Sequence, residues 1–75
     1  MSMTFAYNYA EIDNATNMCV GVMSSSNPNA DGPTNSGTTW VRIPVYDEEY
    51  GFKYYIDGNW YEDAEGTIPW TSSLL

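Results

Sequence analysis

Apolar and polar positions alternate over short stretches of this chain and never recur at a helical spacing. Residues 4–12, TFAYNYAEI, place Phe5, Tyr7 and Tyr9 on one face and Ala6, Asn8 and Ala10 on the other. This period of two is typical of a β-strand. No window carries a sustained i, i+3, i+4, i+7 apolar stripe, and β-branched and aromatic residues dominate the apolar positions. The pattern predicts an all-β fold with no significant helix.

Further apolar stretches predict strands over residues 18–23, 39–46, 51–56 and 59–62. The turn DNATN, residues 13–17, joins the first two strands as a hairpin, because Asp and Asn bond their own backbone and tolerate left-handed conformations. Gly21 indicates a bulge or a close backbone approach. Pro44 cannot donate a ladder hydrogen bond, so its strand lies at an edge or breaks there. We therefore expect a small antiparallel sheet or a partly open barrel of about five short strands.

The stretch KYYIDGNWYED contains the strongest turn signal. Asp57-Gly58 suits a two-residue type I′ turn, which needs positive φ at both central residues. Tyr54, Ile56 and Trp60 are then expected to form cross-strand pairs that hold a hairpin.

Two segments fall outside this strand pattern within a single domain of residues 1–75. The polar loop, residues 24–38, has no large apolar side chain, and loops of this length are uncommon unless functional or disordered. We expect it to contact a neighbouring chain rather than fold on itself. The C-terminal tail, residues 67–75, is too apolar for a free end, and we expect Trp70 to anchor it on a neighbouring subunit. The interface candidates are Ile68, Trp70, Leu74, Leu75, Asn27, Asn29 and Asn35.

The balance of acidic and basic residues narrows the classes of binding partner. Two basic residues face ten acidic ones, a net charge of −8, which disfavours binding to a nucleic-acid backbone or an anionic membrane surface. Seven of the carboxylates lie in residues 47–65, and we expect them to face solvent or a basic partner. No apolar run approaches the length of a membrane span, and the N-terminal residues lack the pattern of a standard secretion signal.

The sequence gives little support for catalysis or for a metal or cofactor site. The chain has one cysteine and no histidine, which excludes an intrachain disulfide, a thiolate zinc site and the usual general base, so we expect no enzyme activity and no cofactor. Cys19 is expected to be a small buried apolar residue. Carboxylates at 47–49 and 62–65 offer oxygen ligands to Ca²⁺ or Mg²⁺, but solvated loop acids are the favoured interpretation, so no metal site is predicted. The aromatic residues are interpreted as core; a sugar platform on Tyr55, Tyr61 and Trp70 is the less favoured alternative.

The segments YAEID, MCVGV, RIPVYD and GFKYYIDGNWYED together resemble a group of small structural and tail-fibre accessory proteins of tailed bacteriophages. The resemblance covers the chain except the polar loop and the C-terminal tail. It implies a non-enzymatic virion protein, such as a capsid decoration, a head-fibre or a tail-fibre accessory protein, made in the host cytoplasm and bound to other virion proteins as a homo- or hetero-oligomer. It implies no catalytic residues. The alternative function is an acidic inhibitor of a host nuclease or defence protein, acting by nucleic-acid charge mimicry.

Overall fold

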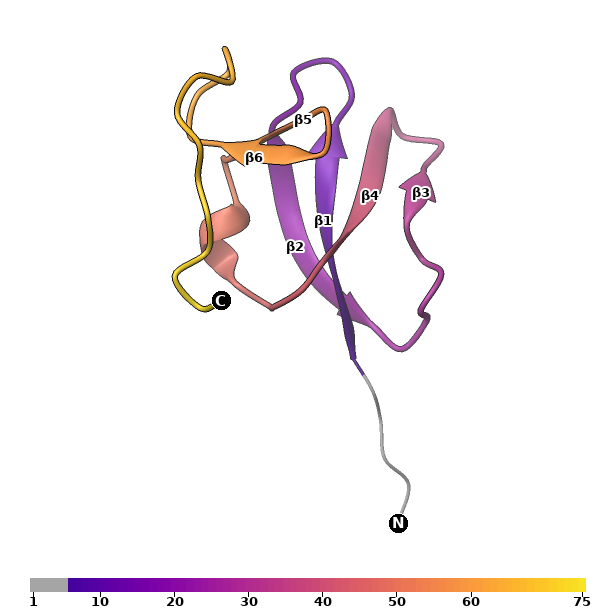
Figure 1. Cartoon of the computed structure of the whole chain (residues 1–75). Coiled ribbons are helices and arrows are strands. Elements are labelled where there is room, and N and C mark those ends of the chain that lie inside the picture. The colour runs from indigo at the N-terminus through magenta and orange to yellow at the C-terminus, as the bar shows by residue number, and fades with distance from the viewer. Residues whose placement is uncertain (1–5) are drawn as a thin grey trace.

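The computed structural model describes residues 6–75, which form two antiparallel sheets. The larger sheet has the strand order β2-β1-β4-β3, and the smaller one is the hairpin β5-β6 (Figure 1). A single 3₁₀ turn, η1, links β4 to the hairpin. The elements are β1 (Tyr7–Asp13), β2 (Cys19–Ser25), β3 (Gly32–Pro33), β4 (Thr38–Ile43), η1 (Glu48–Tyr50), β5 (Tyr54–Ile56) and β6 (Asn59–Tyr61).

The all-β prediction is confirmed, and the sheets do not close into a barrel. Every strand expected from the sequence is present among residues 6–75, and β4 ends at Ile43, directly before Pro44. Thr4 and Phe5, at the start of the first predicted strand, lie outside the described residues. The polar loop supplies one strand that the sequence pattern did not predict, β3, which pairs with β4.

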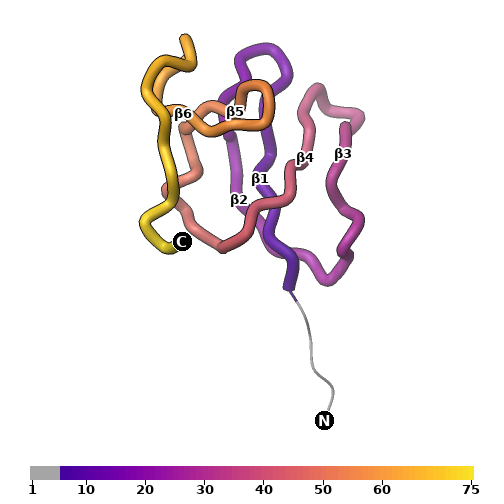
Figure 2. The backbone as a smooth tube through the Cα atoms, viewed as in Figure 1, coloured from indigo at the N-terminus to yellow at the C-terminus, as the bar shows by residue number. Residues whose placement is uncertain are grey.

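The strand β1 is the centre of the larger sheet, and both of its faces are covered. Tyr9 and Ala10 are neighbours with opposite faces, yet both are fully buried. On the Ala10 face lie η1, the β5-β6 hairpin and the C-terminal tail, whose path beside β6 is visible in Figure 2. On the Tyr9 face, the tyrosine hydroxyl donates to the backbone oxygen of Asn27 in the polar loop.

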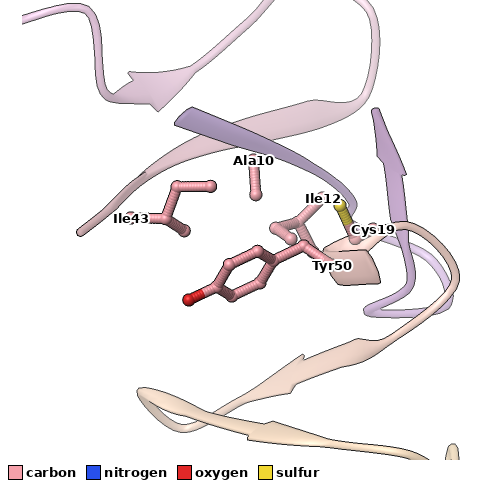
Figure 3. Close-up of a cluster of buried hydrophobic side chains, with 5 residues drawn as sticks. All are labelled: Ala10, Ile12, Cys19, Ile43 and Tyr50. Carbon is pink, nitrogen blue, oxygen red and sulfur yellow. The ribbon is translucent and has the colours of Figure 1, made fainter. Parts of the chain in front are cut away.

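The core is a small cluster between the sheet and the second layer. Its buried members come from β1, β2, β4 and η1, and Tyr50 closes it from below the sheet in Figure 3. Half-buried aliphatic and aromatic side chains pack around it. Aromatic side chains therefore supply much of the buried apolar area that aliphatic residues supply in larger cores. The buried cluster consists of Ala10, Ile12, Cys19, Ile43 and Tyr50.

The β1-β2 hairpin forms as its turn residues predict. Asp13 accepts the backbone N–H of Ala15 through Oδ1 at 2.9 Å, and Asn17 has a positive φ of 66°. The register of β1 against β2 shifts between Glu11 and Ile12, which is a bulge beside Gly21. Sequence reasoning therefore predicted both the turn and the bulge.

The β5-β6 hairpin also forms as predicted. Asp57 and Gly58 have φ values of 51° and 84°, the two positive values of a type I′ turn. Tyr55 lies opposite Trp60 in the register, and their ring centroids are 5.0 Å apart. This cross-strand aromatic pair holds the hairpin and places Trp60 above Tyr50, 4.7 Å away in an edge-to-face arrangement.

The polar loop corrects one expectation. The loop does fold on itself, because its own sheet holds it, while its contact with a neighbouring chain stays a prediction. Arg42 Nη1 donates to the carbonyl of Pro28 at 3.3 Å, and the hydroxyls of Thr34 and Thr38 are 2.7 Å apart. These contacts fold the loop back over the Tyr9 face of β1.

The C-terminal tail requires a second correction. Trp70 was expected to anchor a contact with a neighbouring subunit, but its ring packs edge-to-face on Tyr50, 4.9 Å between centroids, in the same chain. The Trp70 backbone N–H also donates to the carbonyl of Trp60 at 3.0 Å. The expectation for Trp70 is therefore wrong. The tail runs along β6 because its indole completes the core that the short hairpin leaves open.

Candidate binding surfaces

A hollow of about 260 Å³ lies between the β5-β6 turn and the C-terminal tail. We call it the aromatic groove. Three aromatic rings meet along it, since Tyr50, Trp60 and Trp70 pack on one another in edge-to-face arrangements. None of the side chains that line it is charged, in a chain whose net charge is −8. The lining residues are Pro44, Tyr50, Gly58, Asn59, Trp60, Trp70, Thr71, Ser72 and Leu75.

One wall of the aromatic groove is fixed by a buried carboxylate. Asp47, 6% exposed, accepts the Glu49 backbone N–H through Oδ1 at 2.9 Å and thereby caps η1. Its other oxygen accepts the hydroxyl of Ser72, which is itself buried. The Ser72 hydroxyl oxygen in turn accepts the N–H of Leu74 at 3.1 Å. This Asp47–Ser72 clamp ties the tail to η1. It also corrects the expectation that every carboxylate of residues 47–65 faces solvent or a partner.

Tyr50 forms the floor of the aromatic groove. The residue is 2% exposed, and its hydroxyl makes no hydrogen bond with any of residues 6–75. No side-chain oxygen or nitrogen in that part of the chain is sealed from solvent without a partner, so the hydroxyl opens into the hollow that the residue lines. Burial, together with the negative charge of Asp47, raises the pKa of Tyr50, and the hydroxyl stays protonated as a donor.

A second surface lies at the outer edge of the larger sheet. Phe52 is 77% exposed and has a positive φ of 69°. Its backbone N–H donates to the carbonyl of Cys19 at 2.9 Å, which places it beside Val20, itself 49% exposed. Beyond Cys19, the outer edge of β2 pairs with no strand among residues 6–75. We call Val20, Phe52 and this bare edge the edge patch. The sequence placed Phe52 inside a strand, and no local signal reveals its left-handed backbone.

A larger hollow of about 400 Å³ lies at the ends of β1 and β4, but its one charged side chain is already engaged. The Arg42 guanidinium stacks 4.3 Å from the ring centroid of Tyr7 while bonding the loop carbonyl of Pro28. The remaining lining residues have uncharged side chains. They are Ala6, Asn8, Ile43 and Pro44.

The acidic residues do not converge on one point. No group of three or more Asp, Glu or Cys side chains in residues 6–75 is placed to hold a metal ion. Asp63 accepts the backbone N–H groups of Thr67 and Ile68 and the Thr67 hydroxyl, and these bonds lower its pKa. Glu62 pairs with Lys53 at 3.4 Å. Several of the carboxylates in residues 47–65 therefore serve local structure.

Cys19 is fully buried and free, as expected for a small apolar residue. Its thiol donates to the carbonyl of Gly21 at 3.2 Å, and burial raises its pKa. It is therefore an unreactive core residue rather than a nucleophile.

The other interface candidates are exposed. Asn27, Asn29 and Asn35 lie on turns of the polar loop, where the Asn27 side chain accepts the N–H of Asn29 at 2.9 Å. Ile68, Leu74 and Leu75 are 51%, 60% and 66% exposed. These three apolar side chains remain candidates for contact with another protein.

The less favoured alternative, a sugar platform on Tyr55, Tyr61 and Trp70, is not presented as one surface. Tyr55, Tyr61 and Trp70 are all half-buried, and Tyr55 is turned against Trp60. Trp70 alone of the three lines the aromatic groove. Tyr50 was missed in sequence analysis because it follows the acidic run DEE, which predicts only a solvated connection.

Comparison with models of protein families, with curated proteins and with solved structures finds no match. The class that the fold defines is a small all-β domain with two antiparallel sheets. No helix in residues 6–75 has the length and apolar character needed to cross a membrane.

Proposed function

We propose that this chain is a non-enzymatic structural component of a tailed-phage virion, a capsid decoration, head-fibre or tail-fibre accessory protein that acts by binding other virion proteins. The observation that carries the proposal is Phe52 in the edge patch. A bulky residue with positive φ costs on the order of 1–3 kcal/mol of strain, and such strain persists where function requires it. With 77% of its surface exposed, Phe52 gains little burial in return.

The bare edge of β2 adds to this argument. An exposed edge presents unpaired N–H and C=O groups that recognise an extended segment of another protein, while neighbouring apolar side chains add contact area. Val20 and Phe52 supply that area here. Residues 18–30 contain no charged side chain, so β2 itself presents no charge to a partner strand.

The resemblance to phage accessory proteins supports the same function from the sequence. Its quoted segments cover parts of β1 and β2, the end of β4 with the link that follows it, and the β5-β6 hairpin. The absence of histidine from the whole sequence supports a non-enzymatic role.

The test measures the chain in purified phage particles by mass spectrometry. We expect it in particles in a fixed ratio to another virion protein. Phe52→Asn removes the aromatic ring but tolerates the left-handed backbone, so we expect this variant to fold normally and to be depleted from particles. Tyr46→Asn is the control, because Tyr46 is 44% exposed and is not part of the edge patch. Detection of the wild-type chain only in the soluble lysate would refute the proposal.

Charge mimicry is the second candidate and predicts a different salt response. A partner held by the acidic segment dissociates steeply above about 0.15 M salt, where the screening length is about 8 Å, whereas an apolar contact responds little. The engagement of Asp47 and Asp63 in local hydrogen bonds weakens the mimicry hypothesis, because a mimic needs its carboxylates free.

A further inference from the structure

We propose that the aromatic groove binds a neutral saccharide. This inference does not depend on a virion role, because the groove and the edge patch share no residue. It rests on the absence of charged side chains from the lining, on the aromatic rings and on the Tyr50 hydroxyl, which has no partner in residues 6–75.

The rings supply the aromatic surface that a ligand would contact. Trp60 and Trp70 are half-buried and line the groove, with ring centroids 6.5 Å apart. The face of an aromatic ring is electron-rich, and a sugar ring presents C–H groups that carry partial positive charge. The ammonium of Lys53 lies 5.2 Å from the centroid of the Trp70 ring and so fixes that indole from outside the groove. Indoles held in place lose little freedom when a ligand stacks on them.

Polar groups in the groove match sugar hydroxyls. The Tyr50 hydroxyl sits in a residue 2% exposed, has no partner in residues 6–75 and points away from Ile12 and Cys19 in Figure 3. Because the hydroxyl is open to the hollow, a ligand hydroxyl can take the place of solvent as its partner. Asn59 and Thr71 are exposed at the rim of the same groove and offer an amide and a further hydroxyl.

Charge selects among sugars. Asp57 precedes Gly58 at the groove, and Asp47 lies directly behind Ser72. Lys53, the cation beside Trp70, is already paired with Glu62, so these carboxylates disfavour uronic acids, sialic acids and phosphorylated sugars, since like charges repel at close range. A proline-rich peptide also suits aromatic grooves, but such peptides bind along an extended channel. The volume of about 260 Å³ favours a compact ligand of one or two sugar rings.

The experiment titrates the purified full chain with neutral tetrasaccharides, namely cellotetraose, maltotetraose and chitotetraose. Binding is followed by the indole N–H signals of Trp60 and Trp70 in NMR spectra. We expect at least one tetrasaccharide to shift both signals, and tetragalacturonate to shift neither. In Tyr50→Phe, which keeps the ring and removes the hydroxyl, affinity is expected to fall roughly 3- to 10-fold.

Tyr46→Phe is the matched control, because it removes a hydroxyl outside the groove and should bind as the wild type does. Asn59→Ala tests the rim without touching the core and should also weaken binding. The inference is overturned if no neutral tetrasaccharide shifts the indole signals, if Tyr50→Phe and Asn59→Ala bind as tightly as the wild type, or if a poly-L-proline peptide binds in place of the sugars. None of these outcomes bears on the presence of the chain in particles.

Discussion

Breaking the Asp47–Ser72 clamp should destabilise the whole domain, although the bond joins only a 3₁₀ turn to a C-terminal tail. Asp47→Ala removes the cap of η1, which is worth about 1 kcal/mol. It also removes a hydrogen bond to a charged acceptor, worth about 1.5–3 kcal/mol. The expected loss is therefore roughly 2.5–4 kcal/mol, against a total of roughly 4–11 kcal/mol for a domain of this size.

Ser72→Ala should cost somewhat less, roughly 1.5–3 kcal/mol, because the carboxylate of Asp47 stays buried and loses one of its two donors. In the double variant Asp47→Ala/Ser72→Ala, both partners of the hydrogen bond are removed together, so neither is left buried without the other. We therefore expect the double loss to be smaller than the sum of the single losses by about 1–2 kcal/mol. Asp47→Asn is the matched control, since it keeps the shape and an acceptor oxygen for the cap and should lose less than Asp47→Ala.

The assay is urea unfolding followed by tryptophan fluorescence, because Trp60 and Trp70 lie beside the clamp. With a slope of about 1 kcal/mol per molar urea, Asp47→Ala should lower the midpoint by roughly 2.5–4 M. If the single effects add to within about 0.5 kcal/mol, the two side chains act independently and the reasoning fails. An Asp47→Ala variant with the same urea midpoint as the wild type would also refute the reasoning.

Three further predictions follow from single residues. Gly58→Val should lower the free energy of unfolding by more than about 1 kcal/mol, because a β-branched residue is strained at positive φ, whereas Gly58→Asn should lose less; an unchanged urea midpoint for the valine variant contradicts this. Hydrogen bonds lower the folded-state pKa of Asp63, so its stabilisation is present above its ordinary pKa of 3.8 and is lost as pH falls through the lower folded value. Asp63→Asn should therefore make the free energy of unfolding less dependent on pH in this acid range. An unaltered pH profile would count against the assignment. The Cys19 thiol should resist Ellman's reagent at pH 8 in the native protein and react promptly in urea, and fast native labelling would show that the core is open there.

The local features of this fold were predictable from the sequence. The Asp57-Gly58 turn, the break at Pro44 and the bulge beside Gly21 were all predictable, because each depends on the backbone preferences of one or two residues. The strand β3 was not predictable in this way. Its two residues, Gly32 and Pro33, carry no strand propensity and pair with β4 only because the sheet is already in place.

The candidate surfaces were harder to predict from the sequence, because they also depend on packing between segments that are distant in the chain. The apolar side chain of Trp70 does require burial, but it is buried against the core of its own chain. Tyr50 and Phe52 are two residues apart, yet one is buried and the other bare, because η1 and the turn after it reverse the chain between them. Only the long-range packing of η1 against β2 decides which of these aromatic side chains faces outward.

The two edges of the larger sheet differ in a way that limits how copies can associate. One edge is β3, only two residues long and ending in Pro33, whose nitrogen has no hydrogen to offer a neighbouring strand. The opposite edge, β2, remains competent to pair among the residues that the structure describes. Growth of a fibril or a continuous ribbon by strand addition consumes one edge and regenerates another at every step. Pairing of β2 with the β2 strand of a second copy uses this edge in both copies, so it closes a dimer and does not propagate.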